Sequence, residues 1–181
     1  MDGFDLRFVQ MYQCLNEGDM HSLTDDEFEK RSMASDLAFQ SVQQLRGRVL
    51  TMAAELENLI ADCIALYFMP FEGPRQDRFR ISVLEKEACS FYTKYMILKE
   101  IHEALGKNQP HPSWSKIEEL MRIRNIFAHG RIFIDWQTQE VFIKHSKGTD
   151  STKAKFQKFW EVYSASWTEI GEFRRRIENA S

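Results

Sequence analysis

Apolar residues recur every three or four positions along most of this chain, which is the spacing of one helix face. The longest such pattern follows a capping-box sequence at Thr24–Glu27 and predicts helix over residues 24–68. Its seam has the alternating spacings of a bundle helix: Val42, Leu45, Val49, Met52, Leu56, Leu59, Cys63 and Leu66. The pattern allows one continuous helix or a break near Gly47.

Two further helices are predicted before residue 110. Residues 4–16 carry apolar side chains at helical spacing, and a second seam runs from Val83 to Leu105, where Gly106 ends it. The segment 75–80, which contains three arginines, is expected to form a basic connector that precedes this seam. These segments favour a fold built mainly from packed helices.

The C-terminal third predicts two helices separated by strands. Ser113 can cap a helix that ends at Gly130, where glycine suits the left-handed conformation. Residues 131–136 and 140–145 are rich in β-forming side chains and predict a hairpin, with a loop over 147–150. The last helix is expected from residue 151 to residue 178, with an apolar seam at Phe156, Trp160 (with Phe159 beside it), Tyr163, Trp167, Ile170, Phe173 and Ile177.

These patterns predict a mostly α protein, an antiparallel helical bundle with a small β-hairpin near residues 131–145. A length of 181 residues is typical of a single domain over 1–181, with its helical core at about 24–130 and its C-terminal helix at 151–178.

Composition narrows the function classes. The net charge of −3 is unfavourable for a surface that binds nucleic acid throughout, although a local basic site is compatible with it. Three scattered cysteines suit a reducing compartment, and no signal peptide or membrane-spanning stretch is visible, so we expect a cytoplasmic protein without membrane contact. No metal-ligand spacing and no glycine-rich phosphate loop occurs, so no metal or cofactor is expected.

The helix predicted at 113–129 contains one residue that breaks its pattern. On a helical wheel, Arg124 falls within the apolar arc, whereas Asn125 and His129 share the polar side and are close enough to touch. An arginine on an apolar face requires a carboxylate, a subunit interface or an anion, because a buried unpaired guanidinium is costly. Arg124, Asn125 and His129 are therefore the candidate site residues.

The run Arg124-Asn-Ile-Phe-Ala-His-Gly130 resembles the signature of the HEPN superfamily, in which an arginine precedes a histidine late in a bundle helix. The resemblance implies a metal-independent endoribonuclease and a homodimer whose two Arg/His pairs face each other across a cleft. It also implies RNA as substrate and a role in toxin–antitoxin or anti-phage systems, with an antitoxin or nucleotidyltransferase partner. His129 would be the acid/base group, Arg124 the phosphate ligand, and Asn125 would orient His129 or contact the phosphate.

Two alternatives remain open from the sequence. A non-catalytic HEPN-like module would use the same residues to bind nucleotide, RNA or a partner protein, which suits the acidic composition. A dimeric scaffold would need Arg124 only as a structural residue paired with a carboxylate.

Overall fold

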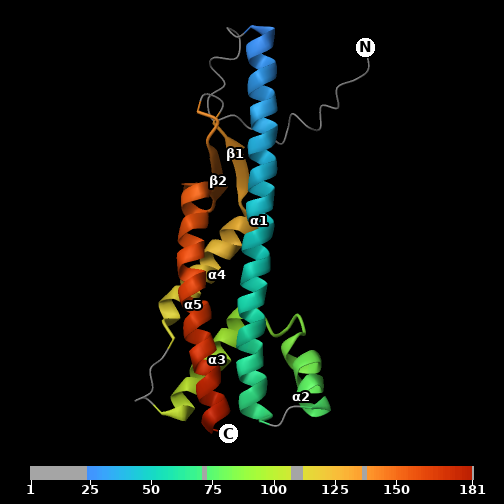
Figure 1. The fold of residues 1–181 in the computed structure, drawn as a ribbon, viewed down its shortest axis with the longest axis vertical. Helices are drawn as coiled ribbons and strands as arrows, with labels where there is room; N and C mark the ends of the chain where they lie inside the picture. Colours follow the sequence, from blue (N-terminus) through green and yellow to red (C-terminus); the bar gives the residue numbers. More distant parts are fainter. Residues whose placement is uncertain (1–23, 71–72, 107–111, 136–137, 181) are drawn as a thin grey trace. The chain divides into compact units, whose positions relative to one another are not determined.

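The computed structural model describes residues 24–70, 73–106, 112–135 and 138–180. The described chain is mostly helical and contains one small sheet (Figure 1). The elements are α1 (Asp25–Phe68), α2 (Pro74–Phe79), the π-helical turn η3 (Arg80–Leu84), α3 (Phe91–Leu105), α4 (Trp114–His129), β1 (Arg131–Ile134), β2 (Val141–His145), β3 (Gly148–Ser151) and α5 (Thr152–Ala180). The helix predicted at residues 4–16 lies outside the described residues.

Helix α1 is continuous over 44 residues, so of the two possibilities that the sequence leaves open, the break near Gly47 does not occur. It begins at the predicted capping box: Thr24 Oγ1 accepts from the Glu27 amide at 3.4 Å, and Glu27 Oε2 accepts from the Thr24 amide at 3.1 Å. Of the two alternating sets in the predicted seam, Val42, Val49, Leu56 and Cys63 are buried, whereas Leu45, Met52, Leu59 and Leu66 are only partly buried.

The chain divides into two compact units. The described part of unit 1 comprises residues 24–50, 124–135 and 138–158, and that of unit 2 comprises residues 51–70, 73–106, 112–123 and 159–180. Helices α1, α4 and α5 each continue from one unit into the other. The expectation of a single domain over 1–181 stays a prediction. None of the described helices has the length and apolarity needed to cross a membrane.

Unit 2 is a packed set of helical segments joined by polar contacts. Lys94 of α3 forms an ion pair with Glu57 of α1 at 2.5 Å, and Tyr163 of α5 donates to Glu55 of α1 at 3.1 Å. Residues at both ends of α3 meet α4, since Tyr95 donates to Glu118 and the His102 ring lies edge-on to Trp114. The start of α3 therefore contacts α4 further along than the end of α3 does, so α3 and α4 are antiparallel, as expected for the bundle.

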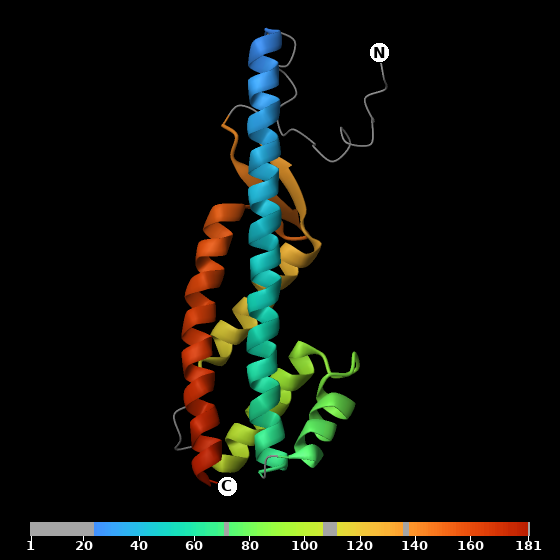
Figure 2. The same cartoon turned by 45° about the vertical axis from the view of Figure 1, so that its right-hand side comes forward.

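The directions of α1 and α5 differ from the antiparallel expectation. In unit 2 both helices run the same way, as their colours show in Figure 1 and again in the rotated view of Figure 2. Glu55 contacts Tyr163, and further along Asp62 and Arg174 line the same cavity. Along the chain, α1 and α5 are separated by α2, η3, α3, α4 and the sheet, so they are not sequence neighbours that a short loop would make antiparallel.

Residues 75–80 are not a simple connector, because they form α2 and the start of η3. Pro74 occupies the first turn of α2, where its missing amide hydrogen costs nothing. Helix α3 begins at Phe91 rather than near Val83, since Ser90 Oγ accepts from the Thr93 amide at 3.2 Å and caps the helix there. The apolar seam expected from Val83 therefore begins in η3, is interrupted by a turn, and is α-helical only from Phe91.

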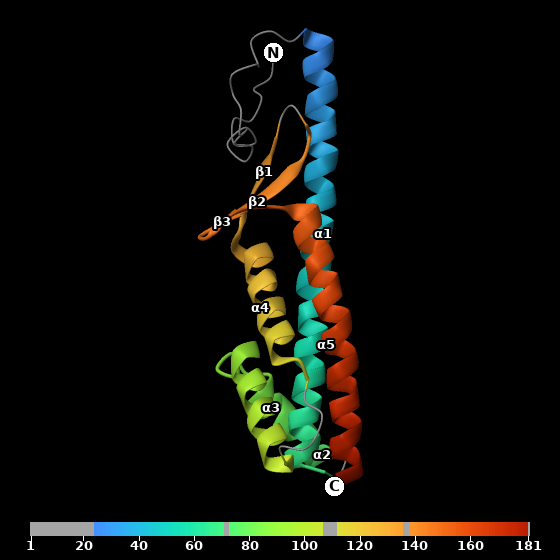
Figure 3. The same cartoon turned by 90° about the vertical axis from the view of Figure 1, so that its left-hand side faces the viewer.

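In unit 1 the sheet lies beside α1, as Figure 3 shows from the side. Ser35 of α1 donates to Gln139 between β1 and β2 at 3.0 Å. The predicted hairpin is present as the antiparallel pair β1–β2, with Arg131 opposite Lys144 and Ile134 opposite Val141. The loop predicted at 147–150 is wrong, because these residues form most of a third antiparallel strand, β3. A third strand stabilises a hairpin that would be marginal alone.

The last helix begins as predicted, but its buried face is rotated. Trp160 and Trp167 of the predicted seam are 46% and 41% exposed. Phe159, expected beside Trp160, is buried, and so are Val162 and Ser166, which the predicted seam does not include. The predicted face and the observed buried face coincide towards the C-terminus, where Ile170, Phe173 and Ile177 are buried. Tyr163 lies between the two tryptophans, with ring centroids 6.2 Å and 5.8 Å away.

Candidate functional site

Helix α4 presents the three candidate residues near its C-terminal end, within unit 1. Of the predicted apolar arc, Ile117, Leu120, Ile123 and Phe127 are buried, whereas Met121 and Ala128 are only partly buried. Asn125 and His129 are exposed, and Arg124 is partly buried. The helix therefore holds Arg124 at the edge of its packed face while His129 is open to solvent.

Arg124 and His129 are five residues apart, so their side chains leave α4 in directions about 140° apart around the helix axis. Asn125 lies only about 40° from His129 on the same wheel. Arg124 Nη1 donates to Asn125 Oδ1 at 3.0 Å, which turns the guanidinium towards the side of the helix that carries His129. Within the described part of the chain, no carboxylate pairs with Arg124, and Asn125 does not contact His129 through a hydrogen bond.

Gly130 ends α4 for a reason that differs from the expected one. Its φ is not in the left-handed region, so the prediction of a left-handed glycine cap is wrong. A Cβ at Gly130 would instead lie 2.5 Å from the Ile126 carbonyl oxygen and 2.5 Å from Ile143 Cγ1. Glycine is required because β2 packs directly against the turn between α4 and β1.

Arg46 of α1 binds the carbonyl groups on both sides of His129. Its Nε donates to the Phe127 carbonyl at 2.5 Å, and its Nη2 donates to the Gly130 carbonyl at 2.6 Å. The last carbonyls of a helix lack helical partners, and a cation there also complements the helix dipole. Arg46 therefore fixes the turn that carries His129. The sequence contains no signal for this contact, because 81 residues separate Arg46 from Phe127.

The start of α4, in unit 2, depends on a residue that the sequence analysis did not identify. Ser113 does not use its hydroxyl to cap the helix; it donates from Oγ to Glu169 Oε1 at 3.2 Å, and its amide donates to Glu169 Oε2 at 2.6 Å. Lys116 Nζ lies 2.7 Å from the same carboxylate. Burial would raise the pKa of Glu169, but these donors outweigh burial and hold the pKa below its usual value.

A second polar cluster joins the sheet of unit 1 to α5. His145 Nε2 lies 2.8 Å from Asp150 Oδ2, and Lys155 Nζ lies 2.9 Å from the same oxygen. The Lys147 amide donates to His145 Nδ1 at 3.3 Å, so Nε2 carries the proton that His145 shares with Asp150. Burial would raise the pKa of Asp150, but the hydrogen bonds from Lys155 and His145 hold it below its usual value.

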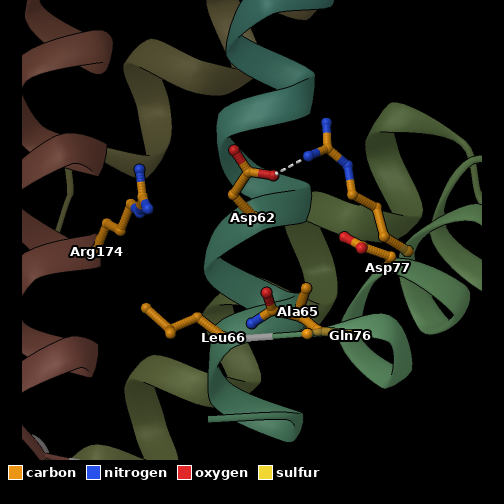
Figure 4. A pocket seen from close by; sticks show the side chains of 8 residues that line it. Asp62, Ala65, Leu66, Gln76, Asp77 and Arg174 are labelled. Carbon is orange, nitrogen blue, oxygen red and sulfur yellow. Dashed lines mark ion pairs between the residues drawn. The ribbon is translucent and has the colours of Figure 1, made fainter. Parts of the chain in front are cut away.

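A separate cavity lies in unit 2 and includes none of the three candidate residues. It encloses about 370 Å³ and is lined by two aspartates, two arginines and four uncharged residues. Arg80 pairs with Asp62 at 2.8 Å. In Figure 4, Arg174 lies on the side of Asp62 away from Asp77. Arg174 is itself paired with Glu178 at 3.2 Å, so the charges around the cavity are largely balanced. Among the described residues, no group of three or more His, Cys, Asp or Glu side chains could hold a metal ion.

Comparison with known proteins identifies no relative: no family model matches the chain, and no curated protein or solved structure matches it. The resemblance to the HEPN signature therefore depends on the Arg124–Gly130 run and its place at the end of α4.

Proposed function

We propose that this protein is a metal-independent endoribonuclease of HEPN type, with a HEPN-like bundle and a homodimeric site. The observation that supports it most directly is the state of Arg124. This arginine borders an apolar face without a carboxylate partner among the described residues, and its guanidinium is turned by Asn125 towards exposed His129. A guanidinium in this state is ready to bind a phosphate, because its planar donors match the phosphate oxygens.

The chemistry requires only groups of these types. The 2′-hydroxyl of RNA attacks the adjacent phosphorus and transfers its proton to a neutral imidazole. The bond from phosphorus to the 5′-oxygen breaks, and an imidazolium returns a proton to that oxygen, which leaves a 2′,3′-cyclic phosphate and a 5′-hydroxyl. The two copies of His129 in a homodimer can divide these two roles, while Arg124 stabilises charge on the non-bridging oxygens.

The test is cleavage of a single-stranded RNA by the purified chain in the presence of EDTA. We expect His129→Ala to lower the rate by ~10²–10⁴-fold, which is the usual contribution of a proton-transfer group. Arg124→Ala should also lose activity. The matched control is Arg122→Ala, because Arg122 is an exposed neighbour that pairs with Glu119 at 2.6 Å. Wild-type cleavage no faster than that of His129→Ala and Arg124→Ala would contradict the nuclease.

The net charge of −3 favours a second candidate, a non-catalytic HEPN-like module that binds nucleotide, RNA or a partner protein. This function predicts RNA binding without cleavage, retained in His129→Ala and lost in Arg124→Ala. A toxin–antitoxin or anti-phage role belongs to the nuclease proposal. A gene for an antitoxin or a nucleotidyltransferase beside the gene for this chain would support that role.

A further inference from the structure

One row of side chains crosses the whole sheet of unit 1. The register places Arg131 of β1 opposite Lys144 of β2, and Lys144 opposite Thr149 of β3. Residues directly opposite one another project from the same face of a sheet, and all three are exposed. The row therefore presents a guanidinium, an ammonium and a hydroxyl group side by side.

No strand residue on this face carries a carboxylate. Because side chains alternate along a strand, the strand residues that share the face are Arg131, Phe133, Phe142, Lys144, Thr149 and Ser151. Asp150 is the one acidic strand residue, and it lies on the opposite face, where His145 and Lys155 bind it. The positive charges of the row are therefore not neutralised within the sheet.

The pairing of Arg131 with Lys144 is unfavourable without a ligand. Like charges directly opposite one another on neighbouring strands destabilise a sheet. Lys144 Nζ lies 5.8 Å from the centre of the Phe133 ring, so its side chain lies over the sheet on the same face as Arg131. An anion bound between the two cations would turn this repulsion into attraction.

The row is also close in sequence to the candidate site. Arg131 follows His129 by two residues, at the point where α4 gives way to β1. Residues 124–158 contain seven Lys and Arg residues against three Asp and Glu residues, whereas the whole chain has 24 against 27. Positive charge is therefore concentrated in the segment that carries both the candidate site and the row.

We infer that Arg131, Lys144 and Thr149 form a phosphate-binding row that holds the backbone of single-stranded RNA beside the position of cleavage. This inference rests on the proposed function and adds a substrate contact to it. Arg and Lys side chains and hydroxyl groups are common donors to nucleic-acid phosphates, and such contacts position the strand without reading its sequence. The row therefore contributes affinity rather than chemistry.

The test is the salt dependence of RNA binding, measured by fluorescence anisotropy with a labelled single-stranded RNA oligonucleotide. His129→Ala serves as the background, so that cleavage does not interfere. Adding Arg131→Ala and Lys144→Ala should weaken binding. The plot of the logarithm of the association constant against the logarithm of the salt concentration should become less steep by about 1.4, since each lost phosphate contact accounts for about 0.7 of the slope. The control adds Lys86→Ala and Arg175→Ala, which remove two exposed charges in unit 2.

The outcomes separate this inference from the nuclease proposal. If the variant that lacks Arg131 and Lys144 gives the same salt slope as the control variant, the inferred phosphate-binding row is wrong, even if the wild type cleaves RNA. A reduced slope in the row variant supports the row, even if the wild type does not cleave. Absence of any RNA binding by the His129→Ala background overturns the row. Because Arg131 and Lys144 are exposed and repel each other, the row variant should be at least as stable to heat as the background, and the control variant should also stay folded.

Discussion

Arg46 Nε donates to the carbonyl oxygen of Phe127 at 2.5 Å, two residues before the candidate catalytic histidine. The same guanidinium reaches the Gly130 carbonyl, so one side chain of α1 binds the end of α4 on both sides of His129. The end of a helix is usually its least ordered part, because its last carbonyls have no helical partners. In this protein a charged donor from a distant helix removes that freedom.

Arg46→Ala should destabilise unit 1 by about 2–3 kcal/mol, because two partly buried carbonyls lose a charged donor. Denaturant unfolding would measure the loss. The control is Arg48→Ala, since Arg48 is exposed and its guanidinium lies over the Phe156 ring, 5.4 Å from the ring centre, so its loss should cost less than about 1 kcal/mol. If the Arg46 and Arg48 variants had the same free energy of unfolding, the contacts of Arg46 with the two carbonyl groups would not stabilise the fold.

Gly130→Ala and Gly47→Ala should change stability in opposite directions. At Gly130 a methyl group would meet the Ile126 carbonyl and Ile143 at 2.5 Å, so we expect a loss of about 1–3 kcal/mol. At Gly47 nothing lies within 4 Å of the added Cβ, and alanine in a helix interior should gain about 0.5–1 kcal/mol. Thermal unfolding of both variants tests this pair. A destabilising Gly47→Ala would contradict a continuous α1.

The contribution of Glu169 should depend on pH. Its pKa is lowered in the folded protein, so its stabilisation is complete above the ordinary pKa of 4.5 and is lost as pH falls through the folded pKa. Glu169→Gln should therefore lower the unfolding free energy by about 1–2 kcal/mol at pH 7, and the difference from wild type should disappear in strong acid. Unfolding at a series of pH values measures this. The matched control is Glu172→Gln, which removes an exposed carboxylate from the same helix.

Mixing wild type with His129→Ala would test the homodimeric site. If one site uses both copies of His129, a mixed dimer has one histidine and no complete site. An equal mixture should then keep roughly a quarter of the cleavage shown by the same total amount of wild type, because a quarter of the dimers are wild-type homodimers. Subunit exchange and RNA cleavage are the measurements. Cleavage at roughly half of the wild-type level, in a mixture shown to contain mixed dimers, would show that each chain works with its own histidine.

Local rules were enough to predict several features from the sequence alone. The capping box at Thr24, the length of α4, the exposed side of α4 and the start of α5 all follow from interactions within a few residues along the chain. Arg124 was recognised for the same reason, since an arginine in an apolar helical arc is visible in the pattern.

Contacts between residues far apart in the sequence determined the rest. The buried face of α5 is rotated to Phe159 and Val162, because which of two apolar faces is covered depends on the helices packed against it. The strand β3 forms because β2 supplies a hydrogen-bonding edge to an otherwise polar segment. Arg46, Gly130 and Glu169 take their roles from partners that no local pattern identifies. Helix ends and periodicity are properties of neighbouring residues, whereas the partner of each face and each charge is a property of the folded chain.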